Sequence, residues 1–133
     1  MTNLYKPFSR LLLFLFLIAF SRPALAAIIP VTNNNNSGSG SLAEAIAIAN
    51  ATPGADEITF NLPVGQETIS LTSPLPNITE AVFINGYSQP GAVTGPVATR
   101  TIVVNIDGTL AGPPTSAFRI DDGGDGTSIA GIA

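Results

Sequence analysis

The feature that most limits how this sequence can fold is a series of short apolar alternations, each ended by Asn or Asp. Four of them end at Asn61, Asn85, Asp107 and Asp121. Alternation with a period of two residues is typical of half-buried strands. Asn and Asp suit the corners after strands because they tolerate left-handed backbone conformations. The sequence therefore predicts a mainly β fold built from many short strands.

These strands recur at a regular interval along the chain. Ile84 follows Phe60 by 24 positions, Ile106 follows Ile84 by 22, and Ile132 follows Ile106 by 26. An interval in the twenties is typical of a solenoid, in which each turn of chain stacks on the one before it. The spacing favours a solenoid, and it leaves open a β-sandwich whose turns favour Asn-Gly and Asp-Gly.

One amphipathic helix is predicted ahead of most of the strands. Ser41 and Glu44 stand in the S-x-x-E arrangement of a capping box, in which each side chain satisfies a free backbone N–H. Pro53 cannot continue a helix, so the segment ends before it. The residues between follow helical spacing on one face. This apolar stripe consists of Leu42, Ala45, Ile46 and Ala49.

The first 26 residues predict a cleavable secretory signal peptide. Basic residues precede an uninterrupted apolar run at residues 11–20. Residues 24–26, Ala-Leu-Ala, then offer the small side chains that a signal peptidase accepts, which places the cut between Ala26 and Ala27. The alternative is a membrane anchor, but a spanning helix needs roughly 20 apolar residues, about twice the length of this run.

Removal of the signal peptide leaves an acidic chain. Arg100 and Arg119 are then the only basic residues against nine Asp and Glu, which gives a net charge of −7 with no Lys and no His. Such a surface repels phosphate backbones, so nucleic acid is excluded as a partner. No second apolar stretch has spanning length, and we predict no membrane span after processing. Because Cys is absent, disulfides and thiolate metal sites are excluded.

Residues 40–50 read Gly-Ser-Leu-Ala-Glu-Ala-Ile-Ala-Ile-Ala-Asn. This segment resembles the N-terminal signature of large bacterial surface and secreted proteins, commonly Cys-Ser-Leu-Arg-Glu-Ala-Ile followed by Ala-Asn. Residues 54–60 and 84–91 resemble later blocks of the same family. The resemblance implies a right-handed parallel β-helix of the pectin-lyase-like type, with an N-terminal cap. Gly40 and Ala43 depart from the family's Cys and Arg, so any bridge or salt link at those positions is missing here.

On this basis we expect three segments. They are a signal peptide (1–26), an N-terminal cap of strand, polar loop and helix (27–56), and the first coils of a parallel β-helix (57–133). The helix is expected to cover the end of the first coil, because that end otherwise exposes apolar interior to water. The residues that form this structural cap are Ser41, Leu42, Glu44, Ala45, Ile46 and Ala49.

The C-terminal residues read as a strand in mid-course, after about three coils. We therefore expect a truncated product or a fragment of a longer protein. An open coil exposes unpaired N–H and C=O groups together with apolar interior, so self-association through it is expected.

An acidic loop at residues 121–126, Asp-Asp-Gly-Gly-Asp-Gly, is the one candidate metal site. The carboxylates of Asp121, Asp122 and Asp125 could present oxygen ligands to Ca²⁺. Gly123 at the third position departs from the ligand pattern of an EF-hand loop. An acidic, solvated turn between two strands is the alternative. No other cofactor is predicted.

No catalytic residue is predicted. Glycoside hydrolysis needs two carboxylates roughly 5–10 Å apart, and the acids of the strands cannot be paired from their spacing alone. The sequence favours a non-catalytic structural or adhesin-like module, secreted or held at the cell surface or outer membrane. Its expected partners are extracellular carbohydrate or cell-surface components. The alternative is the N-terminal fragment of a polysaccharide lyase or glycoside hydrolase whose catalytic coils lie beyond residue 133.

Overall fold

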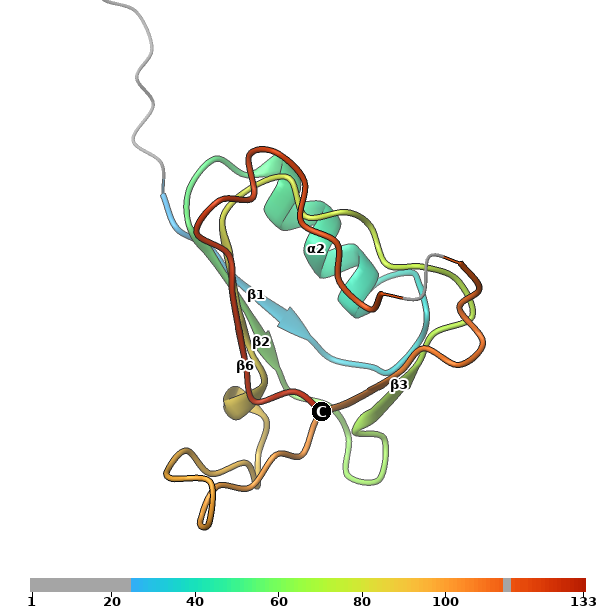
Figure 1. The fold of residues 1–133 in the computed structure, drawn as a ribbon, viewed down its shortest axis with the longest axis vertical. Helices are drawn as coiled ribbons and strands as arrows, with labels where there is room; N and C mark the ends of the chain where they lie inside the picture. Colours follow the sequence, from blue (N-terminus) through green and yellow to red (C-terminus); the bar gives the residue numbers. More distant parts are fainter. Residues whose placement is uncertain (1–24, 114–115) are drawn as a thin grey trace, which may run out of the picture.

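Figure 1 shows the fold of the chain, for which the computed structural model describes residues 25–113 and 116–133. Most of the predicted signal peptide, residues 1–24, lies outside the described residues. The elements in chain order are β1 (Ile28–Val31), α2 (Leu42–Ala51), β2 (Asp56–Phe60), β3 (Thr68–Ser70), β4 (Val82–Asn85), the 3-10 helix η2 (Gly86–Ser88), β5 (Asn105–Asp107) and β6 (Ser128–Ala130).

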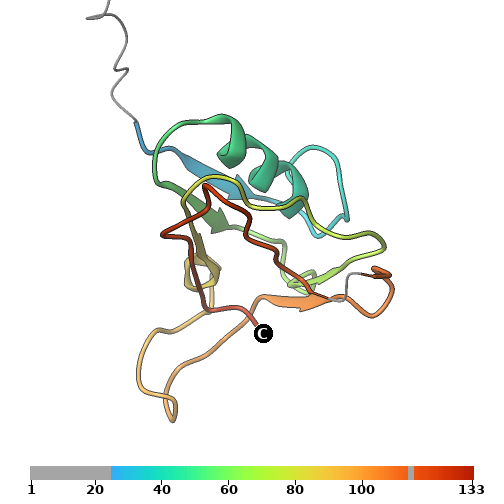
Figure 2. The ribbon, with the colours of Figure 1, turned by 45° about the horizontal axis from the view of Figure 1, so that its top comes forward.

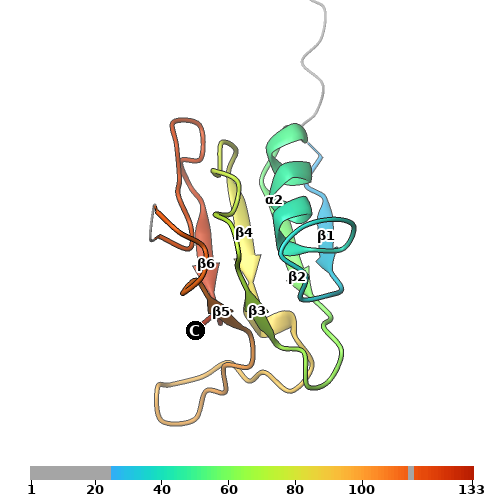
Figure 3. The same cartoon turned by 90° about the vertical axis from the view of Figure 1, so that its right-hand side faces the viewer.

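Four parallel strands form the larger sheet, in the order β1-β2-β4-β6, and they stand side by side in Figure 3. The register aligns one row of isoleucines across all four strands. Ile58 pairs with Ile29 on one side and with Ile84 on the other, and Ile84 pairs with Ile129. Because side chains alternate across a strand, this row lies on one face of the sheet. The apolar alternation of the sequence thus becomes the inner face of a parallel sheet.

A second, two-stranded sheet pairs β3 with β5 in parallel and aligns Ile69 with Ile106. In Figures 1 and 2 it lies across the fold from the larger sheet, and α2 lies beside the space between them. The core fills this space. Among its fully buried side chains are Phe60, Leu42, Ile46, Ile58, Ile69, Leu71, Ile78 and Ile84.

The helix α2 begins at a side-chain cap. Ser41 is its N-cap residue, and its hydroxyl accepts a hydrogen bond from the Glu44 N–H at 3.2 Å. The Glu44 carboxylate accepts from the N–H of Gly40 at 2.6 Å, one residue before the cap. None of the helices in the described part of the chain has the length and apolarity needed to cross a bilayer. The buried residues of α2 are Leu42, Ala45, Ile46 and Ala49, and the helix contacts β1 and β2.

The predicted right-handed parallel β-helix is wrong. Residues 25–113 and 116–133 form a small α/β fold, in which strands of three to five residues gather into two small sheets beside one helix. The interval of 22 to 26 residues has another cause. Parallel neighbours cannot be joined by a tight turn and need a crossover of a dozen or more residues. The β-sandwich alternative is wrong as well, because every pair of named strands within residues 25–113 and 116–133 is parallel.

The correction also changes the role of the helix. Because β1 and β2 are neighbours in one sheet, the strand in residues 27–56 shares that sheet with the strands that follow, and the predicted boundary after residue 56 stays a prediction. The helix α2 packs on β1 and β2 as a layer of the α/β fold, so the expected lid on a first coil is wrong together with the coil.

The two edges of the larger sheet differ in sequence. Pro30 lies in β1, which is an edge strand. This is where proline is tolerated, since it cannot donate to a central ladder. The other edge strand, β6, consists of Ser128, Ile129 and Ala130 and carries neither proline nor charge. Self-association through this C-terminal strand stays a prediction.

Candidate binding face

Alternate residues of the larger sheet point away from the core and form what we call the outer sheet face. All of them are exposed or half-buried, whereas Ile29, Ile58 and Ile84 of the inner row are buried. Two register rows build this face. The first row is Ile28, Glu57, Phe83 and Ser128, and the second is Pro30, Thr59, Asn85 and Ala130.

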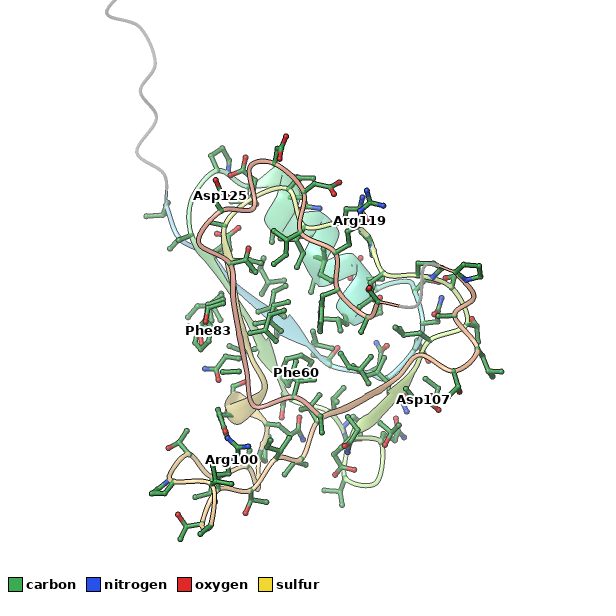
Figure 4. The ribbon with its side chains drawn as sticks, viewed as in Figure 1. Phe60, Phe83, Arg100, Asp107, Arg119 and Asp125 are labelled. Atoms are coloured by element: carbon green, nitrogen blue, oxygen red, sulfur yellow. The ribbon has the colours of Figure 1, made fainter. Side chains whose placement is uncertain are left out.

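Phe83 lies in the interior of this face, on β4. Its register partners are Glu57 on β2 and Ser128 on β6. The residue is 36% exposed, whereas Phe60 on the inner face is 2% exposed. Figure 4 shows the Phe83 side chain directed away from the interior that holds Phe60. An aromatic ring in this position offers apolar contact area to a ligand that lies on the sheet.

A hydrogen bond joins the polar side chains next to this ring. The Asn85 amide donates from Nδ2 to Oε1 of Glu57 at 2.8 Å, across neighbouring strands. The bond fixes both side chains on the outer sheet face. A carboxylate has a second oxygen and a carboxamide has its own, so acceptors remain after this bond is made. The face therefore combines one aromatic ring with oriented hydrogen-bonding groups.

The turn after β4 holds this arrangement in place. Gln89 is 2% exposed, and its side chain bonds both backbone groups of Leu62, accepting from the N–H at 2.8 Å and donating to the C=O at 3.0 Å. The Ser88 hydroxyl accepts from the N–H of Phe60 at 2.7 Å and donates to the Asn85 carbonyl at 2.6 Å. These bonds tie the C-terminal end of β4 to the C-terminal end of β2.

Sequence reasoning missed the outer sheet face. The segment Val82-Phe83-Ile84 predicts a strand, and Glu57 is one of the acids that cannot be paired from spacing. The available signal is the phase of the alternation. Phe83 stands between two buried residues of a strand, so its large apolar side chain must face outward. A large apolar side chain at a strand position that faces outward indicates a binding face.

The acidic loop does not bring its carboxylates together as a metal site. Asp121 accepts hydrogen bonds from Nδ2 of Asn77 at 2.7 Å and from Nε of Arg119 at 3.2 Å. Asp122 and Asp125 are exposed, and Figure 4 shows Asp125 at the surface. Within residues 25–113 and 116–133, no three acidic side chains are grouped so that they could hold a metal ion. The Ca²⁺ site stays a sequence prediction with no added support.

Asp107, at the end of β5, has a pKa below its ordinary value of 3.8. The main cause is the backbone N–H of Thr109, which donates to Oδ1 at 3.0 Å, and the Thr109 side chain adds to it. A hydrogen bond to the charged form favours that form. The stabilisation from this bond is therefore present above the pKa of the unfolded chain and is lost as pH falls through the folded pKa.

We expect Thr109→Ala to raise the pKa of Asp107 part of the way back toward 3.8, because the backbone donor remains while the hydroxyl is lost. Thr109→Ser retains a hydroxyl and is expected to keep the lower value. Titration of the Asp107 side-chain signals by NMR measures both. A Thr109→Ala midpoint equal to that of the unsubstituted protein would show that the hydroxyl plays no part.

Comparison of the chain with family models, curated proteins and solved structures finds no match. The resemblance of residues 40–50 to bacterial surface proteins stays a prediction from those residues.

Proposed function

We propose that this protein is a non-catalytic, extracellular adhesive module that binds uncharged carbohydrate on its outer sheet face. The observation that carries the proposal is the position of Phe83 beside the hydrogen-bonded pair of Glu57 and Asn85. The C–H face of a sugar ring packs against an aromatic ring. The hydroxyl groups of the sugar bond to carboxylate and carboxamide oxygens. Both kinds of group lie next to one another on this face.

Charge favours an uncharged sugar over an acidic one. The chain after residue 26 has a net charge of −7, and Glu57 is the one titratable group among the outer-face residues. Figure 4 places Arg100 in the loop that follows η2, away from Phe83, and Arg119 on the far side of the fold. Arg119 is also bonded to Asp121. A face of this charge repels uronate and phosphate groups.

The composition of the face favours binding over hydrolysis. Glycosidases place two carboxyl groups across the scissile bond, one as acid and the other as base or nucleophile. Here Glu57 is paired with the amide of Asn85, which cannot exchange a proton in that way. The extracellular location is supported by the sequence pattern of residues 1–26.

We expect Phe83→Ala to weaken binding of a neutral oligosaccharide by about tenfold, because an aromatic contact contributes on the order of 1.5 kcal/mol. The measurement is calorimetric titration with a panel of cello-, xylo-, manno- and malto-oligosaccharides. Val97→Ala is the matched control, since Val97 is an apolar residue that is 78% exposed and lies outside the sheet. Its affinity should equal that of the unsubstituted protein.

Two results would contradict the proposal. One is that no sugar in the panel binds. The other is that Phe83→Ala binds as tightly as the Val97→Ala control.

A further inference from the structure

Asp56 is a buried acid with an incomplete set of partners. It opens β2 and is 1% exposed. Its Oδ1 atom accepts a hydrogen bond from the backbone N–H of Ala27 at 2.7 Å. In the described part of the chain, Asp56 Oδ2 is the one buried side-chain oxygen or nitrogen that has no hydrogen-bond partner. A buried carboxylate held by a single neutral donor is unfavourable, and such a group calls for an explanation.

The donor is the nitrogen that signal-peptide cleavage would release. The Ala-Leu-Ala pattern at residues 24–26 places the cut between Ala26 and Ala27. Before cleavage this nitrogen belongs to a peptide bond and offers one uncharged N–H. Hydrolysis of that bond by a signal peptidase consumes one water, leaves a carboxylate on Ala26 and leaves an amine on Ala27, which takes up a proton. The product is an ammonium group with three donors and a positive charge.

We propose that cleavage completes the fold by placing the new α-ammonium group of Ala27 on the carboxylate of Asp56 as a buried ion pair. The nitrogen already lies 2.7 Å from Oδ1, and Oδ2 belongs to the same carboxylate, so β1 has no need to move. The added donors supply the partner that Oδ2 lacks. The mature chain is then anchored at its first residue, and the uncut precursor lacks this anchor.

Hydrogen bonds to β2 hold the backbone of Ala27 in place. The Ala27 carbonyl accepts a hydrogen bond from the N–H of Glu57 at 2.8 Å, so Ala27 is bonded to β2 on both of its backbone groups. Ile28 begins β1 directly afterwards. A terminus one residue earlier would leave the Ala27 nitrogen in a peptide bond, and a terminus one residue later would remove it from Asp56.

No other cation of the mature chain serves Asp56. With no Lys and no His after residue 26, Arg100 and Arg119 are the alternatives. Arg119 bonds to Asp121, and neither arginine is a partner of Asp56 in the structure. The neighbouring acid, Glu57, is directed to the other side of the sheet and bonds Asn85. The α-ammonium group is therefore the cation that can compensate the buried carboxylate.

The absence of lysine provides a direct test. After cleavage the α-amino group is the only primary amine in the chain, so an amine-acylating reagent reports on that group alone. The full chain is expressed with its own leader, and mass spectrometry of the exported product is expected to show Ala27 as the first residue. Acylation by an N-hydroxysuccinimide ester at pH 8 is expected to be at least about tenfold slower in the native protein than in urea. Because an ordinary α-amino group is already about half unprotonated at pH 8, a tenfold decrease corresponds to a rise of about 1.4 units in the pKa of the amine.

Asp56→Asn removes the charge with little change of shape and is expected to restore fast acylation. Asp122→Asn, at an exposed acid, is the matched control and should leave the amine protected. A first residue other than Ala27 would overturn the proposal. So would a native amine that reacts as fast as it does in urea.

A second measurement covers the case in which Asp56→Asn fails to fold. The exported protein is acetylated on its α-amino group in urea and refolded beside a mock-treated sample. Loss of the ion pair is expected to lower the melting temperature by about 4 °C or more. Equal melting temperatures would overturn the proposal, because acetylation removes the positive charge of the α-amino group.

Discussion

Ile46→Asp is expected to leave the protein unfolded in native buffer at 25 °C. Ile46 is fully buried on the face of α2 that packs against β1 and β2. A carboxylate placed there without a partner costs several kcal/mol, in addition to the packing lost. Truncation to alanine alone is expected to cost about 2–4 kcal/mol. Small domains have only about 5–15 kcal/mol of net stability, so the charged variant exceeds what this fold can tolerate.

Circular dichroism and urea unfolding measure the effect, and the helix supplies its own control. Ile48 lies two positions further along α2 and is 43% exposed. The same change of side chain there, Ile48→Asp, is expected to change the free energy of unfolding by less than about 1 kcal/mol. If Ile46→Asp and Ile48→Asp gave the same cooperative urea transition, α2 would not be packed on the sheet in the way described.

The helix could be predicted because its signals are local. The cap residue, the apolar stripe and the breaker all fall within 13 residues, Ser41 to Pro53. The detail that the pattern cannot supply is the partner of Glu44. The N–H of Ser41 already donates to the Gly38 carbonyl at 3.1 Å, so the Glu44 carboxylate accepts from Gly40 instead. The turn from Gly38 to Ser41, ahead of the helix, thus decides which N–H the Glu44 carboxylate accepts from.

Most of the strands could be predicted, although the alternation that ends at Asp121 forms only an isolated bridge at Ile120. The assembly of the strands could not be predicted. Alternation around Ile58 and Ile84 reflects burial on one face, which a single strand reveals. The interval between strands measures the length of a connection, and parallel neighbours need long connections in several folds. Whether those connections stack into coils or lead to two small sheets with a helix depends on contacts between distant segments, which the spacing does not encode.

The partners of the polar side chains could not be predicted from the local sequence either. The acidic loop reads as a set of metal ligands, yet Asp121 bonds Asn77, 44 positions away. The pair on the outer sheet face, Glu57 and Asn85, is separated by 28 positions. The buried carboxylate of Asp56 follows a Pro-Gly-Ala turn in the sequence and gives no local sign of burial. Each partner becomes visible only when parallel strands bring remote residues to neighbouring positions.

Close backbone contact is another property that emerges only in the folded chain, and it leads to the second large effect. Gly86→Ala is expected to lower the free energy of unfolding by about 3 kcal/mol or more, at the upper end of the range for overpacking. Gly86 is buried at the start of η2, directly after β4. A Cβ atom there would overlap the carbonyl oxygen of Gly131 and lie 2.5 Å from its carbonyl carbon. Because the obstacle is backbone rather than a flexible side chain, the chain after β6 must move away from β4.

Gly108→Ala provides the matched control. Gly108 also follows a strand directly, has no left-handed backbone conformation, and would place its Cβ with nothing within 4 Å. Its effect on the free energy of unfolding is expected to stay within about 0.5 kcal/mol. Urea unfolding compares the two variants, and amide hydrogen exchange at Ile129 should be faster in Gly86→Ala because the pairing of Ile84 with Ile129 is weakened. Equal stability of the two variants would show that the segment at Gly131 does not lie against the turn after β4.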